Sequence, residues 1–258
     1  MKIFIVTQND PFFLPKFFEI FLHLIDDDIE VIGVNILKPF NSHHSWYELL
    51  KKYYGYLGTK EFILLGSEYV IYLLANFFRF EIFINKFFSV KRLIKKNKIP
   101  VFSIEKLNSI QFQKLLKCDL LISVACPKIL NKKIINIPKY GSINFHSGFL
   151  PKYRGINPSF WALLNGEKFS AITVHKMDEK LDNGPIIKQK IIDIDSNATL
   201  YSLLNRVSCI GPRVLFDAIK MINKKSFFIG NDRKKSTYYG FPSKKDGKLF
   251  RSKGLKFR

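Results

Sequence analysis

Three polar residues are spaced so that they could act together on a carbonyl group. Asn144 and His146 stand two residues apart in SINFH, an expected strand, so both side chains point to one face. An amide beside an imidazole offers hydrogen-bond donors to one oxygen. Such a pair can stabilise the oxyanion that forms when an amine attacks a carbonyl carbon. His146 can also move a proton near neutral pH.

The third residue is Asp182, in the turn-rich sequence LDNGP. A carboxylate on a tight loop can approach a strand end, and if Asp182 faces His146 it favours the charged imidazolium. It could also take the proton of an amine through a water. The residues alone leave a second interpretation open, in which the strand edge is merely polar and Asp182 belongs to a solvated turn.

Other sites of chemistry find less support in the sequence. Ser147 lacks the GxSxG elbow that would expose a nucleophile, and the neighbours of Cys126 suggest a strand end. Neither GxGxxG nor GxxxxGK is present, so a dinucleotide site and a Walker-type phosphate loop are not expected. Without HxxxH or CxxC spacing, no metal site is expected.

Four motifs follow one another in a fixed order along the middle of the chain. They are Asn144-Phe-His146, Leu150-Pro-Lys-Tyr153-Arg154-Gly155, Thr173-Val174 and Asp182-Asn-Gly184. Together they resemble the catalytic core of the formyltetrahydrofolate-dependent formyltransferases. The resemblance covers most of residues 99–222 and, more weakly, the first strand. It implies N10-formyltetrahydrofolate as co-substrate and direct transfer of its formyl group to an amine, without a covalent enzyme intermediate.

The resemblance also implies roles for the residues. Asn144 and His146 would bind and polarise the formyl oxygen, and Asp182 would orient His146 and, with a water, shuttle the proton. Two loops would hold the pterin ring of the folate, one before and one after this strand. Their expected cofactor-binding residues are Pro127, Lys128 and Leu130 in the first loop, and Glu179, Lys180 and Leu181 in the second.

Four further residues are expected on the side of the acceptor: Asn9, Tyr153, Arg154 and His175. Two of them have an open alternative. Arg154 could equally clamp a main-chain carbonyl as part of the structure. His175 could be a packed strand histidine without contact to substrate.

The acceptor is expected to be a nucleotide-linked amino sugar, as in lipopolysaccharide or surface-glycan synthesis. The sequence TQNDPFF after the first strand lacks the Gly-rich phosphate loop of glycinamide ribonucleotide enzymes. About 35 residues after the catalytic region are too few for the C-terminal barrel of methionyl-tRNA formyltransferases. Transfer to methionyl-tRNA or another amine stays open, as does hydrolysis of formyltetrahydrofolate. A non-enzymatic RNA-binding protein is the remaining alternative, although no RNA-binding motif is recognised.

The net charge of +21 predicts attraction to anions such as a diphosphate or a polyglutamylated folate, or else a solvated basic surface. Residues 224–258 hold twelve Lys and Arg against two Asp.

The three irregularly spaced cysteines, and an N-terminus that enters a strand directly, predict a reducing, cytoplasmic location. Residues 62–90 are apolar, yet their longest uncharged stretch is ten residues, too short for a membrane span. Amphipathic or core helices are expected there, with membrane-surface contact or a dimer interface as alternatives.

Strands and helices that alternate along the chain must position these residues. Strands are expected at 2–7, 30–35, 99–102, 119–124, 143–145, 170–177 and 186–194. Helices are expected at 11–24, within 45–96, at 108–116 and at 199–222, the last bent or broken near Gly211-Pro212. This order predicts an α/β, Rossmann-like fold, a mainly parallel sheet with helices on both faces. We expect a catalytic domain at 1–223, a short basic C-terminal extension at 224–258 and, by resemblance, a homodimer.

Overall fold

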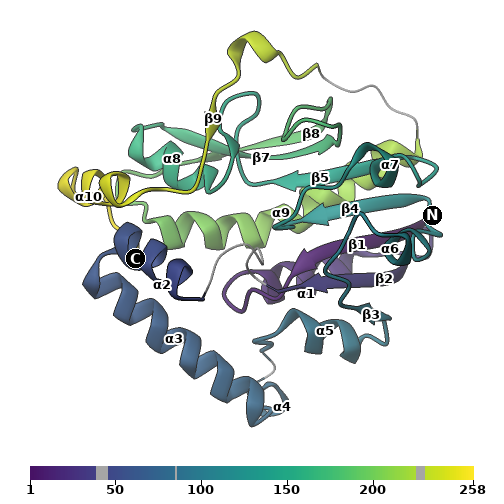
Figure 1. The fold of residues 1–258 in the computed structure, drawn as a ribbon, viewed down its shortest axis with the longest axis horizontal. Coiled ribbons are helices and arrows are strands. Elements are labelled where there is room, and N and C mark those ends of the chain that lie inside the picture. The colour runs from purple at the N-terminus through teal and green to yellow at the C-terminus, as the bar shows by residue number, and fades with distance from the viewer. Residues whose placement is uncertain (39–45, 85, 225–229) are drawn as a thin grey trace.

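The computed structural model describes residues 1–38, 46–84, 86–224 and 230–258 and shows an α/β fold built on one mixed sheet (Figure 1). The strands of this sheet are β1 (Lys2–Gln8), β2 (Glu30–Leu37), β3 (Val101–Phe102), β4 (Leu120–Val124), β5 (Ser142–His146), β7 (Phe169–Lys176) and β8 (Ile186–Asp193). Their order is β3-β2-β1-β4-β5-β7-β8. The first five are parallel, and β7 and β8 are antiparallel. The expected Rossmann-like, mainly parallel sheet is confirmed.

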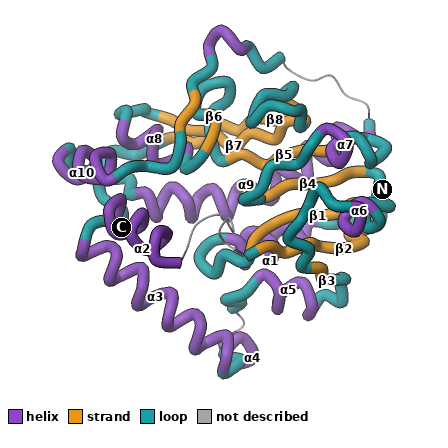
Figure 2. Tube along the Cα trace, in the orientation of Figure 1, coloured by secondary structure: helices purple, strands orange, loops and turns teal. Residues whose placement is uncertain are grey.

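Helices cover both faces of the sheet (Figures 1 and 2). They are α1 (Leu14–Leu24), α2 (Trp46–Leu57), α3 (Thr59–Phe77), α4 (Glu81–Ile84), α5 (Val90–Lys96), α6 (Ile110–Gln113), α7 (Lys132–Ile135), α8 (Pro158–Leu164), α9 (Leu200–Asn223) and α10 (Lys244–Ser252). A short second sheet pairs β6 (Arg154–Gly155) with β9 (Tyr238–Tyr239), just before which lies the 3-10 turn η1 (Arg233–Lys235).

Alternation along the buried strands divides the core into two layers. Ile3 and Ile5 of β1 belong to the cluster that includes α1, α5 and α9. Phe4 and Val6 point the other way, into the cluster under α6 and α7. A parallel strand buried on both faces therefore reads as a continuous apolar run, as KIFIVT does.

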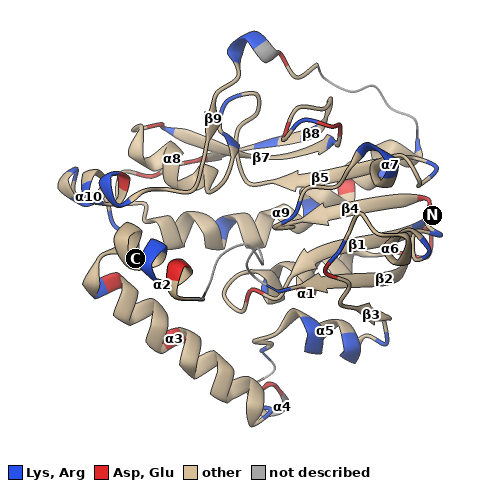
Figure 3. Ribbon diagram, viewed as in Figure 1, with Lys and Arg blue, Asp and Glu red and all other residues tan. Residues whose placement is uncertain are grey.

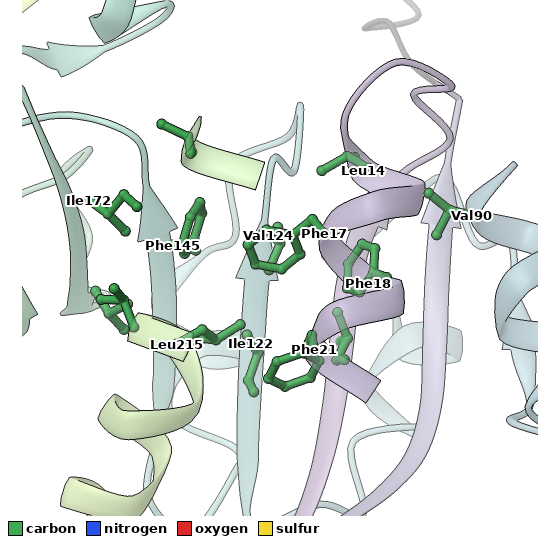
Figure 4. Packing of buried hydrophobic residues seen from close by; sticks show 14 of the residues in the cluster. Leu14, Phe17, Phe18, Phe21, Val90, Ile122, Val124, Phe145, Ile172 and Leu215 are labelled. Carbon is green, nitrogen blue, oxygen red and sulfur yellow. The ribbon is translucent and has the colours of Figure 1, made fainter. Parts of the chain in front are cut away.

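Close packing of α1 and α9 on the sheet fixes the first layer (Figure 4). The ring of Phe17 meets that of Phe145 edge-on at 4.8 Å between centroids. A Cβ at Gly211 of α9 would stand 2.5 Å from Cζ of Phe145, so only glycine fits there. The expected break near Pro212 is wrong, because α9 runs unbroken through this buried, packed position.

Short elements account for the other differences from the expected pattern. The helical region within 45–96 is divided into α2, α3, α4 and α5, and Gly58, at φ 78°, separates the first two. Ser45 lies outside the described residues. The helix expected at 108–116 shortens to α6, capped by Ser109, and the third strand shortens to two residues after Pro100. Helix α8, which begins with Pro158, was not expected.

The C-terminal segment packs on the body of the protein, although its residues 225–229 lie outside the described part. Strand β9 pairs with β6, and α10 lies against α2 (Figure 1). Phe250 and Phe257 are buried in the main core, and the main-chain N–H of Leu200 donates to the oxygen of Lys256 at 3.0 Å. A domain boundary at residue 223 stays a prediction, but residues 230–258 are an integral layer of the fold.

Charged side chains are spread unevenly over the elements (Figure 3). Lysines gather on α5 and α10, whereas most of α3 carries none. Among the described residues, no helix is long and apolar enough to cross a bilayer.

Candidate active site

Strand pairing brings four polar side chains to one face of the sheet. In the antiparallel pair of β5 and β7, Asn144 stands opposite His175 and His146 opposite Thr173. Residues between them, such as Phe145, point into the opposite, apolar layer. The expected placement of Asn144 and His146 on one face is confirmed, and the pairing adds His175, which periodicity within one strand could not reveal.

Asp182 reaches this face from the loop that follows β7. Its backbone has a φ of 50°, which is rare for a residue with a Cβ. The carboxylate accepts a hydrogen bond from the main-chain N–H of Gly155 at 2.8 Å and one from Nδ2 of Asn144 at 3.3 Å. Its oxygens lie 3.7 Å from Nδ1 of His146 and 3.5 Å from Nε2 of His175. The left-handed turn thus aims one carboxylate at three polar side chains.

Hydrogen-bond partners determine which ring nitrogen of each histidine carries the proton. Nε2 of His146 lies 2.8 Å from the main-chain oxygen of Tyr153, and Nδ1 of His175 lies 2.7 Å from that of Lys176. A carbonyl oxygen only accepts, so each of these nitrogens donates. In the neutral form of His146, the lone pair of Nδ1 therefore faces the carboxylate of Asp182.

Burial decides the charge states at the site. It lowers the pKa of His146 below its ordinary 6.5, even though the carboxylate of Asp182 opposes this shift. Burial would raise the pKa of Asp182, but His146, His175 and the N–H of Gly155 outweigh it and lower that pKa to about 2. At neutral pH the pair is thus a neutral imidazole beside an ionised carboxylate.

The loop between β5 and α8 supports the site through its main chain. Arg154 donates from Nε and Nη2 to the oxygen of Leu181 at 2.9 and 2.6 Å, which ties this loop to the loop of Asp182. The phenol of Tyr153 points away and donates to Glu167 at 2.7 Å. Arg154 therefore acts as a carbonyl clamp in this structure, one of its two expected roles, and Tyr153 presents its carbonyl to the site.

A second set of hydrogen bonds holds the beginning of the same loop. Thr173 donates to the oxygen of Gly148 at 2.7 Å, and Gln189 donates to Thr173 at 2.8 Å and to the oxygen of Leu150 at 3.0 Å. All of these come from the face of β7 and β8 that carries the site. The loop is thereby fixed at both of its ends.

The residues expected around a pterin ring lie on two neighbouring loops. Pro127 and Lys128 follow β4, Lys128 donates to Glu105 at 2.6 Å, and Leu130 is buried. In the second loop, Glu179 pairs with Lys132 at 2.7 Å. This pair links α7, just after the first loop, to the loop of Asp182.

The tips of these two loops are more open. Lys180 and Leu181 are exposed, and Lys180 is held through its N–H, which donates to Asp178 at 2.9 Å. Ile129, at the tip of the first loop, is also exposed. The two loops therefore offer apolar side chains of the kind that a flat ring could contact.

Two further candidate residues, Asn9 and Cys126, lie apart from the carboxylate. Asn9, at the end of β1, accepts from Ser89 at 3.2 Å and so anchors the start of α5. Burial raises the pKa of Cys126 to about 11, which leaves a protonated thiol rather than a nucleophile. Within the described residues, no group of three His, Cys, Asp or Glu that could hold a metal is found, and the absence of a metal stays a prediction.

Sequence reasoning missed the contribution of the C-terminal segment. Asn231 donates from Nδ2 to the oxygens of Asp182 and Gly184, both at 3.1 Å. Thr237 accepts from the N–H of Tyr153 at 3.0 Å. Neither residue belongs to a motif, and only the pairing of β9 with β6 brings them to the site.

Comparisons with known proteins agree with this arrangement. The family model described as formyl transferase matches residues 88–219, about half of the chain. The bifunctional polymyxin resistance protein ArnA of Wigglesworthia glossinidia brevipalpis is 39% identical over 175 residues, which cover 66% of this chain and 26% of that protein. The methionyl-tRNA formyltransferase of Thermodesulfovibrio yellowstonii is 37% identical over 163 residues, or 62% of this chain and 53% of that one. The chain spans about half or less of these relatives.

Solved structures share the fold at lower identity. The sugar 3N-formyltransferase WlaRD, solved in the presence of dTDP and 5-N-formyl-THF, has a TM-score of 0.58 at 20% identity and covers 93% of this chain and 69% of its own. Phosphoribosylglycinamide formyltransferase from Anaplasma phagocytophilum has a TM-score of 0.59 at 15% identity, covering 93% and 97%. With the family model and the fold in agreement, the chain belongs to the formyltransferase family.

Proposed function

We propose that this enzyme transfers a formyl group from N10-formyltetrahydrofolate to the amine of a nucleotide-linked amino sugar, with Asn144, His146 and Asp182 as its catalytic residues. One observation carries the proposal. Two hydrogen-bond acceptors, Nδ1 of neutral His146 and Oδ2 of Asp182, face each other across 3.7 Å. This distance is too long for a direct hydrogen bond, and the N–H of an amine would satisfy both groups.

In the proposed mechanism each polar group has a separate chemical role. Nδ2 of Asn144 lies 3.3 Å from both Oδ1 of Asp182 and Nε2 of His175. One of its two N–H groups would turn from His175 to polarise the formyl oxygen. His146, whose only N–H in the neutral form is bound to Tyr153, takes the proton of the attacking amine on Nδ1. The ionised Asp182 then stabilises the imidazolium. The imidazolium of His146 would return this proton to N10 of the folate as the bond between N10 and the formyl carbon breaks, which leaves the imidazole neutral again.

The residues at hand fit a folate as formyl donor. The loops after β4 and β7 are linked by the pair of Lys132 and Glu179, and their tips expose Ile129 and Leu181. Exposed apolar side chains beside polar main chain suit a flat heteroaromatic ring. When bound, the folate would supply the formyl group on N10. Pro127, Lys128, Leu130, Glu179, Lys180 and Leu181 are the residues we propose to hold it.

For the acceptor, two lines of similarity support different substrates. An N-formyltransferase from Helicobacter canadensis, solved with folinic acid and dTDP-3-aminofucose, has a TM-score of 0.58 at 19% identity and covers 93% of this chain. It supports the sugar acceptor, as does the net charge of +21, which suits a diphosphate. The sequence relatives named methionyl-tRNA formyltransferase support tRNA as the second candidate.

The setting of the reaction is part of the proposal. The thiols of Cys118, Cys126 and Cys209 are free, which suits a reducing compartment, so we place the enzyme in the cytoplasm. We further propose a homodimer, the state implied by the family resemblance. On the acceptor side, His175 is held at Asp182 and Arg154 at the neighbouring loop.

One assay tests the reaction and the acceptor together. Purified protein is incubated with N10-formyltetrahydrofolate and either dTDP-, UDP- or GDP-linked amino sugars, initiator methionyl-tRNA, or buffer alone, and mass spectrometry detects a formyl adduct. We expect a gain on one sugar that the Asn144→Ala variant loses. A gain on tRNA alone would replace the sugar by the second candidate. Folate turnover in buffer, without any adduct, would identify a hydrolase and end the transferase proposal.

A further inference from the structure

Helix α3 exposes a broad apolar surface that the formyl transferase model, which begins at residue 88, does not include. Of the 22 exposed large hydrophobic residues that the structure describes, eleven lie between Ile63 and Ile84. They are Ile63, Leu64, Val70, Ile71, Leu73, Leu74, Phe77, Phe78, Phe80, Phe83 and Ile84. We call them the α3–α4 surface. Monomeric proteins rarely expose a contiguous apolar patch beyond about 300–600 Å². We therefore expect this surface to bind a partner.

Helical spacing makes the surface continuous. Ile63, Val70, Leu74 and Phe77 follow one another at intervals of three, four or seven residues and form one stripe along α3. Leu64, Ile71 and Phe78 repeat every seven residues and form a stripe beside it. Between Leu64 and Phe78 the single charged residue is Glu68, one turn from Leu64 and Ile71.

Contacts on the opposite side of α3 hold this surface outward. The rings of Tyr69 and Tyr72 pack on that of Phe12 with centroids 6.3 and 5.6 Å apart. Glu68 is bonded to Tyr72 and paired with Arg258. Because α3 is anchored along its polar and aromatic side, its outer half cannot turn inward to bury the apolar stripes.

Exposed cations accompany the surface, whereas Glu61, Glu68 and Glu81 beside it are half-buried. Lys60 and Arg79, at the two ends of α3, are exposed, whereas Glu81 is half-buried and paired with Arg92 at 2.5 Å. Residues 82–104 contain six Lys and Arg and no Asp or Glu. Figure 3 shows the lysines of α5 next to α4, and the pair of Arg92 and Glu81 joins these two helices.

We propose that the α3–α4 surface binds the surface of an anionic lipid bilayer. An apolar helix face with four exposed phenylalanines at one end, beside a purely basic segment, combines the two attractions of an interfacial helix. A second copy of the chain at this surface would bring the same basic segment against itself. The proposal concerns where the enzyme sits and goes beyond the transfer reaction.

Vesicle flotation with the full chain tests the proposal. Vesicles of phosphatidylcholine with about 30 mol% phosphatidylglycerol are compared with pure phosphatidylcholine vesicles. We expect binding to the anionic vesicles, weakened by about tenfold when salt rises from about 0.05 to about 0.5 M. The Phe77→Ser/Phe83→Ser variant removes the two most exposed phenylalanines, at 75% and 80%, and should weaken binding by about tenfold or more. Lys95→Gln/Lys96→Gln should weaken binding to the anionic vesicles only.

Matched variants elsewhere on the surface serve as controls. Ile110→Ser removes a side chain that is 65% exposed on α6, and Lys114→Gln/Lys117→Gln removes two charges near it. Both should bind as the wild type does. Circular dichroism checks that each variant is folded, and formyl transfer in solution should be unchanged in all of them. Since flotation needs no formyl acceptor, it remains informative even if the proposed reaction is wrong.

Two results would overturn the proposal. One is the absence of flotation with anionic vesicles at low salt, or flotation that the Phe77→Ser/Phe83→Ser variant retains. The other is a dimer, seen by analytical ultracentrifugation, that this variant converts to a monomer while the wild type ignores vesicles. That outcome would assign the α3–α4 surface to a second copy of the chain.

Discussion

The side chain of Asn231 donates to the main-chain oxygen of Asp182 at 3.1 Å, across 49 residues of sequence. The same nitrogen reaches the oxygen of Gly184, so it spans the left-handed turn that presents the carboxylate. A backbone at positive φ is costly for aspartate and persists only where its surroundings hold it. Asn231 is one of these supports, and Arg154 is another, through Leu181.

Replacing Asn231 by alanine should therefore impair catalysis more than folding. We expect kcat to fall by about tenfold, because the turn can relax and the carboxylate moves away from His146. Steady-state kinetics of formyl transfer measure the loss, and thermal unfolding should change little. The Asn223→Ala variant, at an exposed position near the end of α9, is the control. An unchanged kcat in Asn231→Ala would show that the turn holds its shape without this bond.

Removal of the proposed catalytic groups should have larger effects. Asn144→Ala deletes the donor to the formyl oxygen, and a loss of about 10²–10³-fold in kcat is expected from one such donor. Asp182→Asn keeps the shape but removes the charge that stabilises the imidazolium, with a loss of similar size. Single-turnover mass spectrometry of the formylated acceptor measures both. Variants that kept more than about a tenth of the activity would place the chemistry on other residues.

The pH dependence of the reaction should report His146. The proton of the amine goes to neutral imidazole, so kcat/KM should fall in acid, with its midpoint below 6.5 because burial lowers the pKa of His146. The carboxylate of Asp182 raises this pKa, so Asp182→Asn should move the midpoint to still lower pH. Rates between about pH 5 and 8 test both statements. A midpoint above 6.5 in the wild type, or an upward move in the variant, would contradict this role.

Much of this site could be predicted from the sequence because its parts are local. A spacing of two residues along a strand places Asn144 and His146 on one face. The sequence LDNGP marks the turn that carries Asp182. The buried strands were visible as short apolar runs because the sheet is covered on both faces.

The rest depends on contacts between distant parts of the chain. Asn144 faces His175 only because β7 is antiparallel to β5, and no periodicity within one strand contains that direction. Similarly, β9 and β6 are each two residues long and form strands only because they pair with each other. No local sequence pattern therefore marks the roles of Asn231 and Thr237. Residues 224–258 appeared as a basic tail by composition, whereas Phe250 and Phe257 fix the segment to the core.

Ionisation of Asp182 should stabilise the fold above the pH at which an unfolded aspartate titrates. Its pKa is lowered from 3.8 to about 2, so the contribution is present above pH 3.8 and is lost as pH falls towards 2. Its size is on the order of 2 kcal/mol. The lowered pKa of His146 acts in the same direction, because the unfolded chain takes up that proton first. Urea unfolding at about pH 5 and about pH 3 measures the difference.

Asp182→Asn should reduce this acid sensitivity, and Asp27→Asn, at an exposed position, is the matched control. If Asp182→Asn and the wild type lost the same stability between these two pH values, the carboxylate would not be preferentially ionised in the folded state.

The packing of the C-terminal segment leads to a last prediction. Phe250 of α10 is fully buried, stacks on Phe160 of α8 at 4.8 Å between centroids and packs at a tilt against Phe257 at 4.7 Å. Truncation to alanine should cost about 3–5 kcal/mol of unfolding free energy, through lost burial and the cavity left behind. Leu249→Ala, next to it but 47% exposed, should cost much less. Phe250→Leu provides an intermediate change in case the alanine variant does not fold. Equal small losses at Phe250 and Leu249, measured by denaturant unfolding, would mean that α10 is a detachable tail; a large difference would make it part of the catalytic body that also carries Asn231 and Thr237 to the site.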